Sequence, residues 1–223
     1  MEQQPGRRCS RCCFHRCSHL VHAQTYHGRV SDFFIGLPLV AAAYLAGSFP
    51  TASIIGLMSG HDHSREGSGN PGASNVWRTS GARYGLLTVV IDALKGFLPV
   101  LITMLVIDRP WASVVWVAAT VGHCFPLGRL RSGGKGMATG GGGSLPLYPL
   151  LGAALIVLFT LIVRLTKVAA LGSLIVTACL VLGVVALHES KVEIVSAVAV
   201  AAVIIGRHRS NIGRIVSGKE LHV

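Results

Sequence analysis

The sequence predicts an all-α integral membrane protein: a compact bundle of seven transmembrane helices, with the N-terminus outside and the C-terminus in the cytoplasm. Composition is the first reason, because 51% of the 223 residues are hydrophobic and only 13% are charged, whereas soluble domains carry about 25% charged residues. The apolar residues gather in long runs, and basic residues mark alternate connections between them. The mean hydropathy of +0.59 excludes a soluble domain, and the abundant Val, Ile, Leu and Ala exclude a disordered chain.

Six apolar runs each predict one crossing. They are residues 33–58, 85–107, 111–127, 150–163, 168–187 and 192–206. The seventh crossing is residues 137–148, an uncharged segment with four consecutive glycines and Pro146. Glycine costs about 1 kcal/mol relative to alanine in a helix. We therefore expect this segment to be partly unwound, or helical only when it is packed against its neighbours.

The distribution of charge favours seven crossings over six. With the N-terminus outside, twelve Lys and Arg lie in inner segments and two, Arg109 and Lys191, lie in outer loops. With six crossings, the four basic residues of the C-terminal segment would change sides. The five arginines of residues 1–32 depart from the rule.

Residues 1–32 form a basic tail, and residues 33–223 form the membrane domain. The tail holds four cysteines and several histidines that offer ligands for zinc. Their spacing matches no standard zinc finger, so we favour a disordered tail or a start codon assigned too far upstream. The net charge of +11 does not indicate nucleic acid as a partner, because the chain has no interleaving of aromatic and basic residues.

Three polar segments, residues 67–83, 122–138 and 207–220, all face the cytoplasm in this arrangement. Their glycines let backbone N–H groups approach an anion. They also supply cations and hydrogen-bonding groups: Arg78, Lys135, His208 and Arg209, with Ser68, Asn70, Ser74, Asn75 and Asn211. We predict an anion site where the segments meet. Nucleotide-binding motifs are excluded, since the G-x-G-x-x-G of residues 67–72 follows no strand and SGGKG lacks the Walker A spacing.

Asp92 and Lys95 are charged residues inside a predicted crossing, on one helical face. Charges in such positions are rarely idle. Two interpretations stay open: an ion pair that fixes the helix, and direct contact with a substrate. His123, near the end of the third crossing, is either a satisfied polar residue or a site residue. A small transporter with Asp92 and Lys95 along its path is the alternative function, although the sequence has no internal repeat of spans.

The polar segments read GSGNPGASNVWRTSG, GHCFPLGRLRSGGKGMAT and RHRSNIGRIVSGKE. They resemble the three cytoplasmic motifs of the bacterial acyl-phosphate:glycerol-3-phosphate acyltransferases, the PlsY family. The resemblance runs from about residue 46 to residue 220. It implies a seven-helix membrane enzyme of the bacterial inner membrane. Such an enzyme transfers a fatty acyl group from acyl phosphate to the 1-hydroxyl of sn-glycerol 3-phosphate, in the first acylation step of phospholipid synthesis. The implied partners are these substrates, the bilayer and the soluble enzyme that makes acyl phosphate from acyl carrier protein.

The resemblance also assigns residues. Ser68 and Arg78 fall on the essential Ser and Arg of the first motif, and Ser74 stands where Thr is usual. Binding residues by the same pattern are Gly69, Asn70, Asn75, Gly133, Gly134, Gly136, Arg209 and Glu220, around the catalytic set Ser68, Arg78, Lys135, His208 and Asn211. Ser210 and Gly213 depart from the pattern.

Acyl phosphate is a mixed anhydride and is already activated, so the reaction needs no protein nucleophile, cofactor or metal. We expect Arg78, Lys135, His208 and Asn211 to hold the phosphates, and the proton of the attacking hydroxyl to pass to the acyl phosphate. His208 is the alternative base.

Overall fold

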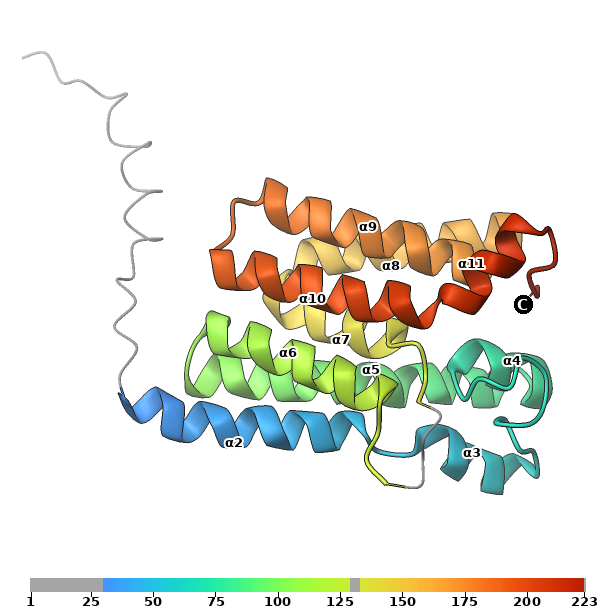
Figure 1. Cartoon of the computed structure of the whole chain (residues 1–223), viewed down its shortest axis with the longest axis horizontal. Helices are drawn as coiled ribbons and strands as arrows, with labels where there is room; N and C mark the ends of the chain where they lie inside the picture. The colour runs from blue at the N-terminus through green and yellow to red at the C-terminus, as the bar shows by residue number, and fades with distance from the viewer. Residues whose placement is uncertain (1–29, 129–132, 223) are drawn as a thin grey trace, which may run out of the picture.

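The computed structural model describes residues 30–128 and 133–222, and every regular element within them is an α-helix (Figure 1). The long helices lie side by side and alternate in direction. The elements are α2 (Val30–Gly47), α3 (Thr51–Ser59), α4 (Ala73–Ser80), α5 (Ala82–Val106), α6 (Arg109–Cys124), α7 (Met137–Leu147), α8 (Pro149–Thr166), α9 (Ala169–Ala186), α10 (Lys191–Arg207) and α11 (Arg209–Val216).

Four helical stretches among the described residues are long and apolar enough to cross a membrane. They are Val30–Ser59, Ala82–Val106, Pro149–Thr166 and Ala169–Ala186. The other expected crossings are helical but shorter, with 16, 11 and 17 residues in α6, α7 and α10. At a rise of about 1.5 Å per residue, α7 extends over roughly half of the ~30 Å hydrocarbon layer.

The first expected crossing is interrupted. It begins at Val30, three residues before the predicted boundary, and it divides at residues 48–50 into α2 and α3. Pro50 precedes α3 and gives it no side-chain cap. The carbonyl of Phe49 accepts hydrogen bonds from Thr51 N at 2.9 Å and from the Lys95 ammonium. The rest of the predicted N-terminal tail, with its Cys and His cluster, lies outside the described residues.

The glycine-rich segment is helical throughout α7, which agrees with the second of the two expected alternatives, a helix packed against its neighbours, and not with a partly unwound segment. Its glycines lie where neighbouring helices approach most closely. A Cβ on Gly142 would overlap the carbonyl oxygen of Ala93 in α5, and one on Gly143 would overlap the ring of Trp116 in α6. Trp116 Nε1 also donates to Gly140 O at 2.8 Å. Tight packing therefore replaces the helix propensity that these glycines lack.

The two ends of the bundle differ. At one end Arg109 joins three elements, because it donates to Leu147 O at 2.9 Å and pairs with Glu193 at 2.8 Å and Glu189 at 3.2 Å. At the other end lie α3, α4 and α11 (Figure 1), with residues 133–136, which precede α7, close to them. The three polar segments of the sequence thus meet at one end of the molecule, as predicted.

Candidate active site

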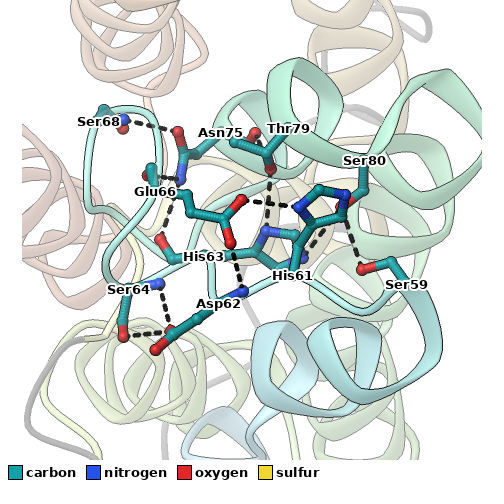
Figure 2. A network of polar contacts seen from close by, with 10 residues as sticks. All are labelled: Ser59, His61, Asp62, His63, Ser64, Glu66, Ser68, Asn75, Thr79 and Ser80. Carbon is teal, nitrogen blue, oxygen red and sulfur yellow. Dashed lines mark hydrogen bonds and ion pairs between the residues drawn. The ribbon is translucent and has the colours of Figure 1, made fainter.

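The loop between α3 and α4 is shaped by the side chain of Asn75. Its Nδ2 donates to the carbonyls of His63 and Glu66, both at 3.0 Å, and its Oδ1 accepts from Ser68 N at 2.8 Å (Figure 2). Gly67 has a φ of +59°, and a Cβ there would overlap Asn75 Oδ1. Asn75, predicted as a binding residue, is 1% exposed, and its side chain stabilises this loop through hydrogen bonds to the backbone.

His63 and Thr79 hold the same loop against α4 (Figure 2). Thr79 Oγ1 donates to Asn75 O at 2.9 Å, and it lies 2.9 Å from His63 Nδ1. Since the hydroxyl proton is used by the carbonyl, Nδ1 of His63 carries the hydrogen of the second bond. Burial lowers the pKa of His63, the neighbouring His61 lowers it further, and the carboxylates of Glu66 and Asp62 oppose this. A neutral ring fits this hydrogen-bond pattern.

Ser68 and Arg78 are brought together by this loop. Arg78 Nη2 donates to Ser68 Oγ at 3.4 Å. Arg78 Nε is buried without a hydrogen-bond partner among the described residues. Burial lowers the pKa of Arg78, Glu220 opposes that effect, and Arg214 adds to it. The Arg78 guanidinium thus retains an unpaired N–H donor close to the charges of Glu220 and Arg214.

The glycine–lysine loop (residues 133–136) packs tightly against the end of α6. A Cβ on Gly134 would overlap His123 Nε2, and one on Gly133 would overlap the carbonyls of His123 and Cys124. Gly136 has a φ of +81° and precedes α7. Only residues without a side chain fit such approaches, which accounts for the three glycines around Lys135.

Arg207, at the end of α10, holds the loop from another direction. Its Nη2 donates to Gly133 O at 2.6 Å and its Nε to Gly134 O at 3.1 Å. Its guanidinium carbon lies 5.3 Å from the centroid of the Phe125 ring. Two donors of one planar group therefore fix two successive carbonyls.

Lys135 lies among these cations. Burial lowers its pKa to about 8; Arg214, Arg78 and Arg207 contribute by repulsion, and Glu220 opposes them. No hydrogen bond or ion pair within the described residues engages its ammonium. A cation that is desolvated, repelled by its neighbours and unpaired gains strongly from a bound anion.

His208 connects α10 to α11 and is 3% exposed. Its Nδ1 lies 2.8 Å from Ile204 O, so Nδ1–H donates to that carbonyl and Nε2 stays available. Burial lowers the pKa of His208, and the carbonyl raises it. The net direction is downward, which leaves a neutral ring with Nε2 as an acceptor.

Glu220 organises the last of the three segments. One of its oxygens accepts from Asn211 Nδ2 at 2.6 Å, and the other pairs with Arg214 Nε at 2.9 Å. Asn211 Oδ1 is buried and has no partner within the described residues. The contacts of Glu220 orient Asn211 and Arg214. That Glu220 also binds substrate stays a prediction.

The predicted residues thus fall into three groups. Ser68, Arg78, Lys135, His208 and Asn211 come from separate segments and lie at the same end of the bundle, with Glu220 and the glycine–lysine loop among them. Gly69 shapes the first loop with a φ of +67°. Arg209 is exposed, and Asn70 and Ser74 are partly buried without a hydrogen bond among the described contacts.

The sequence interpretation missed Arg207 and Arg214 as site residues. Both were counted as orientation charges at the inner face. The sequence did hold a signal for them, because both lie in the same motif as His208 and Asn211.

Asp92, Lys95 and His123 lie behind the glycine–lysine loop. They line a cavity of about 600 Å³ that is also lined by Gly133 and Gly134. Lys95 Nζ pairs with Asp92 Oδ1 at 2.7 Å. Among the described residues, no group of three or more His, Cys, Asp and Glu is arranged to hold a metal ion.

Comparison with known proteins identifies the family. A family model described as glycerol-3-phosphate acyltransferase matches residues 37–218. A protein of that name from Trichlorobacter lovleyi is 41% identical over 186 residues, which cover 83% of this chain and 96% of the relative. Another, from Anaeromyxobacter dehalogenans, is 40% identical over 201 residues, 87% of this chain and 100% of the relative.

Two solved structures share the fold. Both are crystal structures of PlsY (YgiH), an integral membrane glycerol 3-phosphate acyltransferase, and both are 33% identical to this chain. The glycerol 3-phosphate form has a TM-score of 0.81 and covers 84% of this chain and 95% of its own. The lysophosphatidic acid form has a TM-score of 0.78, with 84% and 94% covered. With the apolar helices described above, this likeness makes the chain an all-helical, multi-pass membrane protein. The chain therefore belongs to the glycerol-3-phosphate acyltransferase family and is an acyltransferase.

Proposed function

We propose that this protein transfers a fatty acyl group from acyl phosphate to the 1-hydroxyl of sn-glycerol 3-phosphate, giving lysophosphatidic acid and inorganic phosphate. One observation carries the proposal: Lys135 is desolvated and repelled by Arg78, Arg207 and Arg214, and Glu220 is the carboxylate that opposes this repulsion. Such an excess of desolvated positive charge suits a pair of phosphorylated reactants. The PlsY structures in glycerol 3-phosphate and lysophosphatidic acid forms support the choice of acceptor and product.

The enzyme lies in the bacterial inner membrane with seven crossings, its N-terminus outside and its C-terminus in the cytoplasm. The end of the bundle that carries α4, with Arg78, and α11, with Arg214, is then the cytoplasmic end (Figure 1), in accord with the orientation rule. Its substrates reach this end from the cytoplasm. The soluble enzyme that makes acyl phosphate from acyl carrier protein supplies the donor at that surface. The short helices α6, α7 and α10 complete the crossings within the bundle.

In the reaction, the glycerol hydroxyl oxygen attacks the carbonyl carbon of the acyl phosphate. The bond between this carbon and the oxygen that bridges it to phosphorus breaks. The donor phosphate takes up the hydroxyl proton and leaves as inorganic phosphate. The protein must hold two anions close together and align the hydroxyl with the carbonyl. Lys135 and Arg78 neutralise the phosphates, since each has unpaired donors.

His208 and Asn211 align the acceptor, which departs from the phosphate contact expected from the sequence. Both present an available acceptor atom, His208 Nε2 on a neutral ring and Asn211 Oδ1, which is buried without a partner among the described residues. Glycerol hydroxyls donate to these atoms. This assignment makes His208 an orienting residue and leaves proton transfer to the donor phosphate. If His208 were instead the essential general base, His208→Gln would lower kcat by 10²-fold or more, about the contribution of such a base. Near-normal turnover at saturating substrate excludes it.

The direct test uses the full-length protein purified in detergent with glycerol 3-phosphate and one of three donors: palmitoyl phosphate, palmitoyl-CoA or palmitoyl acyl carrier protein. The proposal predicts lysophosphatidic acid with palmitoyl phosphate alone. Lys135→Met should abolish that activity. The matched control, Arg164→Gln, neutralises an exposed charge at the end of α8 and should leave it unchanged. Turnover with thioesters alone would reassign the donor, and no turnover with any donor would contradict the proposal.

A further inference from the structure

A buried charge cluster joins three helices behind the candidate active site. Lys95 Nζ, on α5, lies 2.7 Å from Asp92 Oδ1 and 2.7 Å from Phe49 O, in the break between α2 and α3. His123 Nδ1, on α6, lies 3.7 Å from the same Asp92 oxygen. These three side chains are 8%, 2% and 8% exposed for Lys95, Asp92 and His123.

The hydrogen bonds of Lys95 favour a structural task over direct contact with a substrate. An ammonium has three donors, and two of them are engaged at short distance. One engages the Phe49 carbonyl, which lies in the break between α2 and α3 and also accepts from Thr51 N at 2.9 Å. Backbone groups at membrane depth require such partners. Lys95 therefore stabilises the break, and Asp92 compensates its charge.

The same turn of α5 supports the start of α7. Thr139 Oγ1 donates to Asp92 O at 2.8 Å. A Cβ on Gly96 would overlap Thr139 O, so the two helices meet with no side chain between them. Because α7 begins at Met137, two residues after Lys135, the placement of α5 fixes the C-terminal side of the glycine–lysine loop.

His123 supports that loop at its N-terminal side. Its ring lies directly against Gly134, and its carbonyl lies against Gly133. Asp92 is the charged partner of this ring, and all three side chains of the cluster face the cavity that Gly133 and Gly134 also line. The loop is thus held at both ends by groups that contact one turn of α5.

We propose that Asp92, Lys95 and His123 are positioning residues for the glycine–lysine loop, and that they set where Lys135 meets the phosphate of the substrate. The inference rests on the proposed role of Lys135 in binding that phosphate. It assigns Asp92 and Lys95 to the positioning of a substrate-binding loop, rather than to a transport path or to helix stability alone.

The test measures glycerol 3-phosphate binding to the full-length protein in detergent by titration calorimetry, without an acyl donor. The double variant Asp92→Asn/Lys95→Met removes the pair without leaving a buried charge unpaired. We expect its Kd to rise about tenfold, the scale of a displacement below 1 Å at a binding group. The KM for glycerol 3-phosphate should rise equally, with kcat changed much less.

The matched control breaks the ion pair at the other end of the bundle with Arg109→Met/Glu193→Gln. This pair is also buried on one side, since Glu193 is 3% exposed, and its loss should lower thermal stability while Kd stays near the wild-type value. Unchanged Kd in the Asp92→Asn/Lys95→Met protein would overturn the inference, and so would an equal rise in the control. Should that double variant fail to fold, His123→Asn replaces it, with the same expected rise.

The outcomes also separate this inference from the proposed function. Wild-type protein that binds glycerol 3-phosphate but gives no product with palmitoyl phosphate contradicts the donor assignment alone. The binding comparison between the two double variants then still decides the role of the cluster.

Discussion

Raising the pH from 7 to 9 is expected to reduce the catalytic efficiency of the enzyme by discharging Lys135. Its pKa of about 8 follows from burial and from repulsion by Arg214, Arg78 and Arg207, with Glu220 opposing. With this pKa, the Lys135 side chain of the substrate-free enzyme is about 90% charged at pH 7 and about 10% charged at pH 9. If the charged form alone binds the phosphate, kcat/KM for glycerol 3-phosphate falls about tenfold between these values.

The sign follows from the direction of the shift. A lysine with its usual pKa near 10.4 would stay charged throughout this range and produce no decline. Bound phosphate stabilises the ammonium, so its pKa rises in the complex and the decline lies mainly in KM. Burial lowers the pKa of His208, so its ring becomes protonated at a lower pH than a free imidazole. The phosphate of the substrate has its own second pKa near 6, so its titration would hide an effect of His208 on the pH–rate profile in the acid range.

The assay is the initial rate of lysophosphatidic acid formation at fixed palmitoyl phosphate and varied glycerol 3-phosphate, corrected for spontaneous hydrolysis of the donor. Lys135→Arg is the informative variant, since arginine stays charged at every pH tested. It should lose the alkaline decline, even if its absolute rate is lower. A wild-type profile that is flat between pH 7 and 9.5 would refute the reasoning, as would a decline that persists in Lys135→Arg.

Three further predictions concern single contacts. Gly142→Ala should lower the unfolding temperature in detergent strongly, because its Cβ would overlap Ala93 O, whereas Gly141→Ala, with nothing within 4 Å of its Cβ, should stabilise α7 by about 1 kcal/mol. Arg207→Lys should raise the KM for glycerol 3-phosphate about tenfold, since one ammonium cannot replace a two-donor fork; an unaltered KM would contradict the role of that fork. Glu220→Gln should move the alkaline decline to lower pH, because Glu220 raises the pKa of Lys135; a shift to higher pH would contradict this sign.

The family, the helical class and the end of the molecule that carries the site could all be predicted from the sequence. Each depends on information that is local or additive: apolar runs, the sum of charges in each loop, and three contiguous motifs. Residues within one motif keep their spacing in any fold. Ser68, Arg78, Lys135, His208 and Asn211 could accordingly be named as candidate site residues from the sequence, and their roles stay predictions.

The conformation of α7 needed the tertiary structure. Intrinsic propensity made a helix of residues 140–143 uncertain, because glycine has no side chain to pack and a high entropic cost. The same lack of a side chain permits backbone contact with Ala93 and Trp116. Local preference and global packing therefore act in opposite directions, and packing prevails where three helices close around the segment.

The roles of the charged residues needed the structure for a different reason. A charge near the end of a helix has the same appearance in sequence whether it orients the chain, binds a ligand or holds another residue. Arg207 and Arg214 entered only the count of inner charges and received no site role, and Glu220 was predicted to bind substrate. In the fold, Glu220 engages Asn211 and Arg214, and Arg207 engages two carbonyls. Lys135 alone among these cations has no protein partner within the described residues, and that difference makes it the group whose titration should control phosphate binding.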